Sequence, residues 1–91
     1  MNRGDVLDAV KNTICNDRQD THGNPENTHQ LIAEFWSAYL SQRGMAGVDL
    51  TAQDAAVMMA LFKIARHAVN PQHYDNLHDG IGYMAIAAEL Y

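Results

Sequence analysis

The sequence has one cysteine, two prolines and few basic residues, and these shortages exclude several classes of protein. Cys15 alone cannot form an intrachain disulfide or a thiolate metal cage, so we expect a reducing cytoplasm as its setting. No run approaches the roughly 18 apolar residues of a membrane span, and the N-terminal MNRGDVLD has no signal-peptide core. Six basic against 11 acidic residues give a net charge of −5, which argues against generic binding to DNA or RNA.

The remaining composition is typical of one small globular domain. The 91 residues are 47% hydrophobic and 19% charged, which is enough for a modest core. Apolar residues recur at helical spacing, and no strand pattern or internal repeat is convincing. We therefore expect residues 1–91 to form a single all-α domain, a compact four-helix structure.

Cap residues and helix breakers mark the expected helices. A side chain that can accept a hydrogen bond precedes each helix, and a proline stands at the first position of the second one. Thr51 and Asp54 have the spacing of a capping box, which gives Asp54 a structural role. The expected helices are a first from Asp5 to about Cys15, a second at 25–42 capped by Asn24, a third at 52–69 capped by Thr51, and a last that begins near Tyr74–Asn76 and is capped by Asp75.

The third helix is apolar nearly all round, which is typical of a helix at the centre of a fold or in a subunit interface. We expect both, and hence a homo-oligomer. The last helix should bury a stripe made of Leu77, Ile81, Met84 and Ala88. His29 falls in the apolar arc of the second helix, where a histidine is more often a core residue than a ligand.

One narrow stripe of the third helix is cationic. Lys63, Arg66 and His67 are three or four residues apart or adjacent, so they lie close together. Their charges need water or an anionic partner. A ligand phosphate would serve, since arginine binds phosphate through two hydrogen bonds and lysine neutralises it as a point charge. An internal salt bridge to Asp75 or Asp79 would serve equally.

The last helix opens with an acidic cluster. Asp75 and Asp79 are one turn apart, and His78 is on the same side. Such a set suits Mg²⁺, and Mn²⁺ or Zn²⁺ as well. Acidic residues in a first turn also favour the helix dipole without any ligand. Gly82, one turn further on, either leaves room for a ligand or permits close helix packing.

Three stretches of the chain carry a shared signature: the R-x-x-x-H-G-x-P pattern of Arg18, His22, Gly23 and Pro25, the W-S-A-Y-L of the second helix, and the run from Met59 to Tyr83. With these motifs the chain resembles a small all-α family of mostly uncharacterised phage and prophage proteins. Its members are distantly similar to the MazG-type nucleotide pyrophosphohydrolases, which bind Mg²⁺ through helix carboxylates and assemble as dimers or tetramers. The resemblance covers Asp17 to Leu90.

The resemblance implies a nucleotide-handling protein whose ligand lies at a helical oligomer interface. Lys63, Arg66 and His67 would meet the phosphate, Arg18 and His22 would close over it, and Tyr83 or Trp36 would stack on a base. Metal-dependent hydrolysis would release pyrophosphate from a nucleoside triphosphate. The sequence departs from the MazG-type pattern, however. It has only two carboxylates in the second helix and Asn76-x-x-Asp79 in place of Glu-x-x-Asp.

These departures leave two other interpretations open. The first is a non-catalytic sponge that sequesters a host signalling nucleotide, or an inhibitor of a host defence protein, in the cytoplasm of an infected or lysogenic bacterium. The second is a structural interaction module, in which Lys63 and Arg66 pair internally with Asp75 and Asp79. The ligand, the metal and the oligomeric state are not fixed by the sequence.

Overall fold

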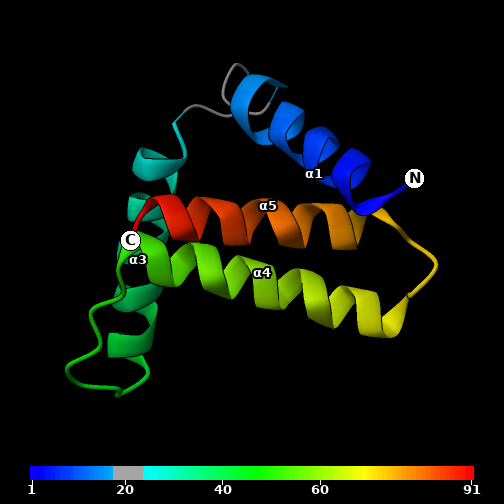
Figure 1. Ribbon diagram of the computed structural model, residues 1–91. Helices are drawn as coiled ribbons and strands as arrows, with labels where there is room; N and C mark the ends of the chain where they lie inside the picture. Colours follow the sequence, from blue (N-terminus) through cyan, green and yellow to red (C-terminus); the bar gives the residue numbers. More distant parts are fainter. Residues whose placement is uncertain (18–23) are drawn as a thin grey trace.

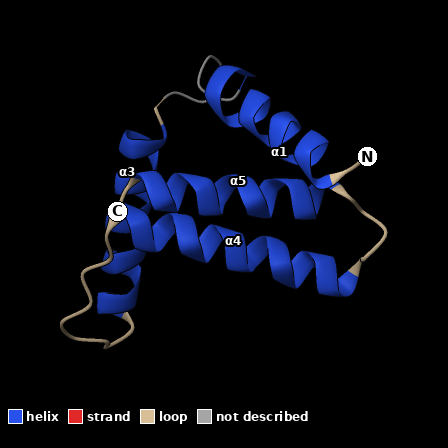
Figure 2. Ribbon diagram, viewed as in Figure 1, coloured by secondary structure: helices blue, strands red, loops and turns tan. Residues whose placement is uncertain are grey.

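Residues 1–17 and 24–91 are described by a computed structural model, and they form four α-helices and one short π-helical segment. Figure 2 shows these helices joined by loops, with no strand in the described part of the chain. The prediction of an all-α fold with four helices is therefore confirmed. The elements are α1 (Arg3–Asn12), η1 (Thr13–Asp17), α3 (Pro25–Gln42), α4 (Ala52–Val69) and α5 (Asp75–Glu89).

The antiparallel pair of α4 and α5 is the centre of the fold (Figure 1). α1 lies against α5, and α3 packs against α4 near the end of the pair where the C-terminus lies. Two hydrogen bonds fix this arrangement. The Ser37 hydroxyl on α3 accepts from the backbone N–H of Leu50 (2.8 Å), and the Gln53 side chain on α4 donates to the carbonyl of Ala87 on α5 (3.0 Å).

Two predicted helix starts are confirmed in detail. Asn24 caps α3, where its side chain accepts from the backbone N–H of Glu26 at 2.9 Å. Thr51 and Asp54 form the expected capping box on α4. The Thr51 hydroxyl accepts from the Asp54 N–H (3.1 Å), and the Asp54 carboxylate accepts from the Thr51 N–H (2.9 Å). Asp54 therefore has the structural role that its spacing indicates.

Two other helix starts differ from the prediction. The cap of α1 is Asn2, and Asp5 occupies the third helical position, where the two residues form a capping box. α1 also ends at Asn12, since the chain continues as the π-helical η1. At α5 the cap position belongs to Tyr74, whose backbone is already helical (φ −55°, ψ −35°) and whose side chain makes no cap bond. Asp75 thus lies inside the helix, because a side-chain cap requires an extended backbone.

Small side chains dominate the core of the described structure. Seven hydrophobic residues are buried, and five of these are alanines. Because alanine carries only a methyl group, α4 and α5 can approach closely. The buried hydrophobic residues are Val10, Ala33, Ala55, Ala56, Ala60, Ile86 and Ala87.

The large apolar side chains mostly lie outside this core. Leu77, Ile81 and Met84 are 47%, 36% and 51% exposed, and Ala88 is exposed too, so the prediction that they form a buried stripe was wrong for the single chain. The reason is that α1 and α4 pack on other sides of α5. No helix in the described ranges is long and apolar enough to cross a membrane.

Candidate functional site

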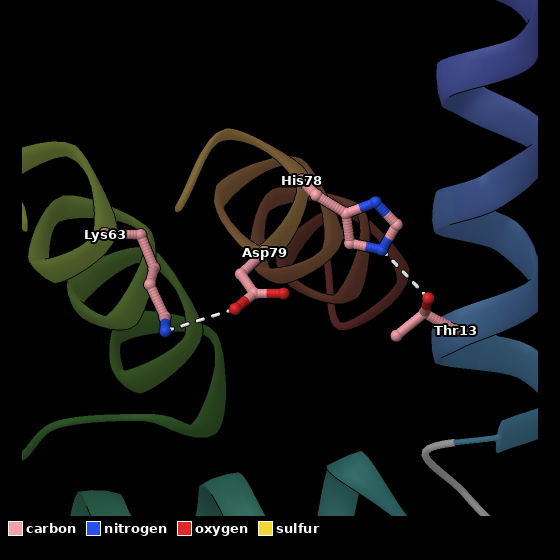
Figure 3. Close-up of polar contacts among 4 residues, drawn as sticks. All are labelled: Thr13, Lys63, His78 and Asp79. Atoms are coloured by element: carbon pink, nitrogen blue, oxygen red, sulfur yellow. Dashed lines mark hydrogen bonds and ion pairs between the residues drawn. The ribbon is translucent and has the colours of Figure 1, made fainter. Parts of the chain in front are cut away.

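The predicted cationic stripe lies on the second half of α4, and its first member is already neutralised. The Lys63 ammonium is 3.2 Å from the Asp79 carboxylate on α5, and the two side chains are only 16% and 21% exposed (Figure 3). This is the internal pair that the sequence left open as an alternative. A partly buried pair of this kind joins α4 to α5, so Lys63 is committed to the fold.

Arg66 differs from Lys63 in having no carboxylate partner among the described residues. Its residue is exposed, and its guanidinium carbon lies 5.6 Å from the centre of the Phe62 ring. The Lys63 ammonium lies 5.8 Å from the same ring. A guanidinium held over an aromatic face keeps its hydrogen-bond donors free at its edge. Arg66 is therefore available to an anion.

A hollow of about 490 Å³ surrounds Arg66 at the end of α4, and we call it the Arg66 groove. It has one permanent positive charge and no acidic residue in its lining. Arginine with amide and imidazole side chains can donate several hydrogen bonds to one phosphate, while an aromatic wall suits a nucleotide base. The lining residues are Phe62, Ala65, Arg66, Val69, Asn70, His73 and Asn76.

The expected metal ligands on α5 do not converge. His78 points to the start of η1, where its Nε2 lies 2.8 Å from the Thr13 hydroxyl, whereas Asp79 points to Lys63 on α4 (Figure 3). The Thr13 hydroxyl also lies 3.1 Å from the carbonyl of Ala9, so it bonds within its own helical turn and across to α5, and the tautomer of His78 sets which partner of the Thr13–His78 bond donates. No group of three His, Cys, Asp or Glu side chains that could hold a metal ion occurs in the residues the structure describes.

The reason lies in the packing on the two sides of α5. Consecutive helical residues are about 100° apart, so His78 and Asp79 can face two different helices even though both lie near Asp75 along the chain. Asp75 itself is exposed in the first turn. The assignment of these three residues to a metal site therefore remains a prediction, and a single chain does not bring them together.

Tyr83 and Gly82 serve the packing of the fold. Tyr83 is half-buried against the core cluster of Ala56, Ile86 and Ala87, and its ring meets that of His29 edge-on at 5.9 Å. His29 is 5% exposed, which agrees with its interpretation as a core histidine. A methyl group at Gly82 would lie 3.0 Å from a methyl of Ile14, so this glycine lets η1 approach α5 closely.

The other predicted ligand-binding residues have different surroundings. His67 is half-buried beside α5, and its Nδ1 is a buried atom with no hydrogen-bond partner in the described structure. Arg18 and His22 lie outside the described residues. The sequence reasoning missed Phe62 and His73 as members of the groove. The spacing of four residues between Phe62 and Arg66 was the available signal, since such pairs meet on one helix face.

The chain matches a family described as a domain of unknown function, DUF6378, over residues 5–91. It is 34% identical over 85 residues to the Gene 55 protein of Mycobacterium phage L5, covering 93% of this chain and 51% of that protein. It is 28% identical over 86 residues to the Gene 55 protein of Mycobacterium phage D29, covering 94% and 53%. The chain thus spans about half the length of the curated relatives it matches. No solved structure matches it.

Proposed function

The chain belongs to the DUF6378 family, which includes phage proteins, and we propose that it binds a nucleotide or a related phosphorylated small molecule in the Arg66 groove. The observation that carries the proposal is the guanidinium of Arg66, which lacks a carboxylate partner in the described structure and lines a hollow without acidic residues. In a chain with a net charge of −5, such a local site is where an anion would be attracted.

Each part of the groove matches one part of a nucleotide. Arg66 can form two parallel hydrogen bonds with a phosphate. His73 and Asn70 stand in the turn beside it, where the backbone N–H of His73 already donates to the carbonyl of Asn70 (3.2 Å). Phe62 lines the groove and supplies an aromatic ring for contact with a base, next to the Arg66 guanidinium that lies over it. This division of roles favours a ligand that is both anionic and aromatic over inorganic phosphate alone.

Retention of the ligand without turnover is the form of this function that we favour. Pyrophosphohydrolysis of the MazG type would need several carboxylates around Mg²⁺. Asp79 is held by Lys63, and His78 is held by Thr13, so neither is free in a single chain. The proposed biological role is therefore a sponge for a phosphorylated host metabolite. Metal-dependent hydrolysis is the competing possibility.

A nucleotide panel tests the proposal. We expect at least one nucleotide to raise the melting temperature and to bind in isothermal titration calorimetry. Substitution of Arg66→Gln should weaken that binding by roughly 10- to 100-fold, since a charge-assisted hydrogen bond is worth about 1.5–3 kcal/mol. Arg43→Gln is the matched control, because Arg43 is an exposed arginine at the end of α3 that does not line the Arg66 groove. It should leave affinity within twofold.

Chromatography of the same mixtures, with Mg²⁺ or Mn²⁺ added, distinguishes the two forms of the function. Intact nucleotide recovered after denaturation supports the sponge, whereas nucleoside monophosphate with pyrophosphate supports the hydrolase. Binding by the Arg66→Gln variant that equals binding by the wild type would refute the assignment of the site. Absence of binding by every nucleotide would refute the function itself.

A further inference from the structure

A second hollow, of about 680 Å³, lies between α4 and α5 and is almost wholly apolar. Its floor is made of small residues, and its rims carry large side chains that stand out from the surface. We call this surface the α4–α5 apolar face. Its floor is Ala60 and Gly80, its rims are Ile64 on α4 and Leu77, Ile81 and Met84 on α5, and the exposed Ala85 lines it as well.

The sequence pattern of this face is that of a buried surface. Leu77, Ile81 and Met84 follow the i, i+4, i+7 spacing with which a helix meets its core. In the structure they point away from that core, and Ile64 on the neighbouring helix is 60% exposed. Soluble monomers rarely leave a contiguous apolar patch of this kind open to water. Such a face has the character of an interaction surface.

The total surface of the chain agrees with this reasoning. Its accessible area is 6420 Å², whereas a monomeric protein of 10.1 kDa is expected to expose about 5,300 Å². Its radius of gyration is 14.4 Å, against about 12 Å for a compact domain of this length. The excess of roughly 1,100 Å² is comparable to the 800 Å² or so that one partner contributes to a standard interface. An interface of standard size would cover most of this excess.

We propose that the partner is a second copy of this chain, docked through the same α4–α5 apolar face around a two-fold axis. Two such helix pairs, laid face to face, make a four-helix bundle in which each rim enters the hollow of the other copy. The excess surface of roughly 1,100 Å² matches the size of one such contact.

Two chains that each carry a net charge of −5 repel one another, so they can meet only through a surface without unpaired charge. The rims of this face are uncharged. The one cation in its lining, Lys63, is neutralised by Asp79 at 3.2 Å. His67 at the same hollow retains a buried Nδ1 without a hydrogen-bond partner in the described structure. Such atoms are usually satisfied in a complete assembly.

This interface is independent of the proposed ligand. A different apolar ridge, formed by Leu31, Phe35 and Tyr39 on α3, is also exposed, but it stands on a single helix and lines neither hollow. That ridge supplies the matched control for a test of the interface.

Sedimentation equilibrium of the full chain over a range of concentrations measures the assembly. We expect a dimer for the wild type. Ile81→Glu should weaken it roughly 1,000-fold, because loss of one central contact costs about 30-fold and two-fold symmetry counts the loss twice. Phe35→Glu should leave the dimer intact. Met84→Glu, at a position that is 51% exposed, is the second variant in case Ile81→Glu fails to fold by circular dichroism.

Three results would overturn the proposal. The first is a wild-type chain that stays monomeric at several hundred micromolar. The second is a dimer that tolerates both Ile81→Glu and Met84→Glu. The third is dissociation by Phe35→Glu, which would assign the contact to α3 instead. Nucleotide binding by a folded but monomeric Ile81→Glu protein would show that ligand binding survives without the interface.

Discussion

The ion pair between Lys63 and Asp79 decides whether the most prominent cation of α4 serves the fold or a ligand. Its atoms are 3.2 Å apart. Coulomb's law then gives about 1.3 kcal/mol at the dielectric constant of water and about 5 kcal/mol at an effective value of 20. The side chains are 16% and 21% exposed, so the environment lies between these limits, and desolvation offsets part of the gain. We expect a net coupling of about 1–3 kcal/mol.

A double-mutant cycle with Lys63→Met and Asp79→Asn measures this coupling. Urea unfolding is followed by far-ultraviolet circular dichroism at one fixed protein concentration, because assembly would otherwise shift the midpoint. Asp79→Asn alone should be the more harmful single change, since it leaves a largely buried ammonium without a partner. A coupling below about 0.5 kcal/mol would refute the structural role of the pair. Nucleotide binding that survives in Lys63→Met would also support the structural role of the pair, because it would show that Lys63 does not bind the ligand.

Two further predictions concern packing and capping. Gly82→Ala should have a free energy of unfolding at least about 1 kcal/mol lower than that of Gly80→Ala. Both substitutions gain the same helix propensity, but only the first places a methyl 3.0 Å from Ile14. Equal urea midpoints for the two variants would contradict the close approach. The Gly80 methyl meets nothing nearer than 3.8 Å. Thr51→Ala should lower the free energy of unfolding by about 1 kcal/mol, and Thr51→Ser should lower it by much less because serine keeps the hydroxyl. A large loss of stability in Thr51→Ser would show that the hydroxyl hydrogen bond is not what stabilises the start of α4.

The helices were predictable because their ends depend on local chemistry. Asn24 before a proline and the capping box of Thr51 with Asp54 use only neighbouring residues, and both starts appear where expected. Asp75 failed as a cap because the preceding turn brings Tyr74 into helical conformation, which depends on the whole turn at 70–74. Asp5 was displaced by Asn2 for a simpler reason, since both can accept from a backbone N–H and Asn2 stands earlier.

The direction in which each face points could not be predicted in the same way. A stripe such as Leu77, Ile81 and Met84 has the same spacing whether it meets the chain's own core or a partner's. His78 and Asp79 are adjacent in the sequence of α5. Nothing in that sequence indicates that His78 bonds to Thr13 of η1 while Asp79 pairs with Lys63 of α4. The pairing of Lys63 with Asp79 was one of two alternatives. Choosing between them required the packing of α4 on α5.

The positions of Arg66 and Ile64 on α4 bear on whether the ligand site is built at an oligomer interface, as the sequence led us to expect. Two residues apart, they project about 200° from one another around the helix. An interface through Ile64 would therefore leave the Arg66 groove open, and the two functions should separate. Asn76, which is 4% exposed, lines both hollows and is a physical link between them. If Ile81→Glu abolishes nucleotide binding while the protein stays folded, the interface and the Arg66 groove are coupled, and the ligand site depends on the oligomer interface.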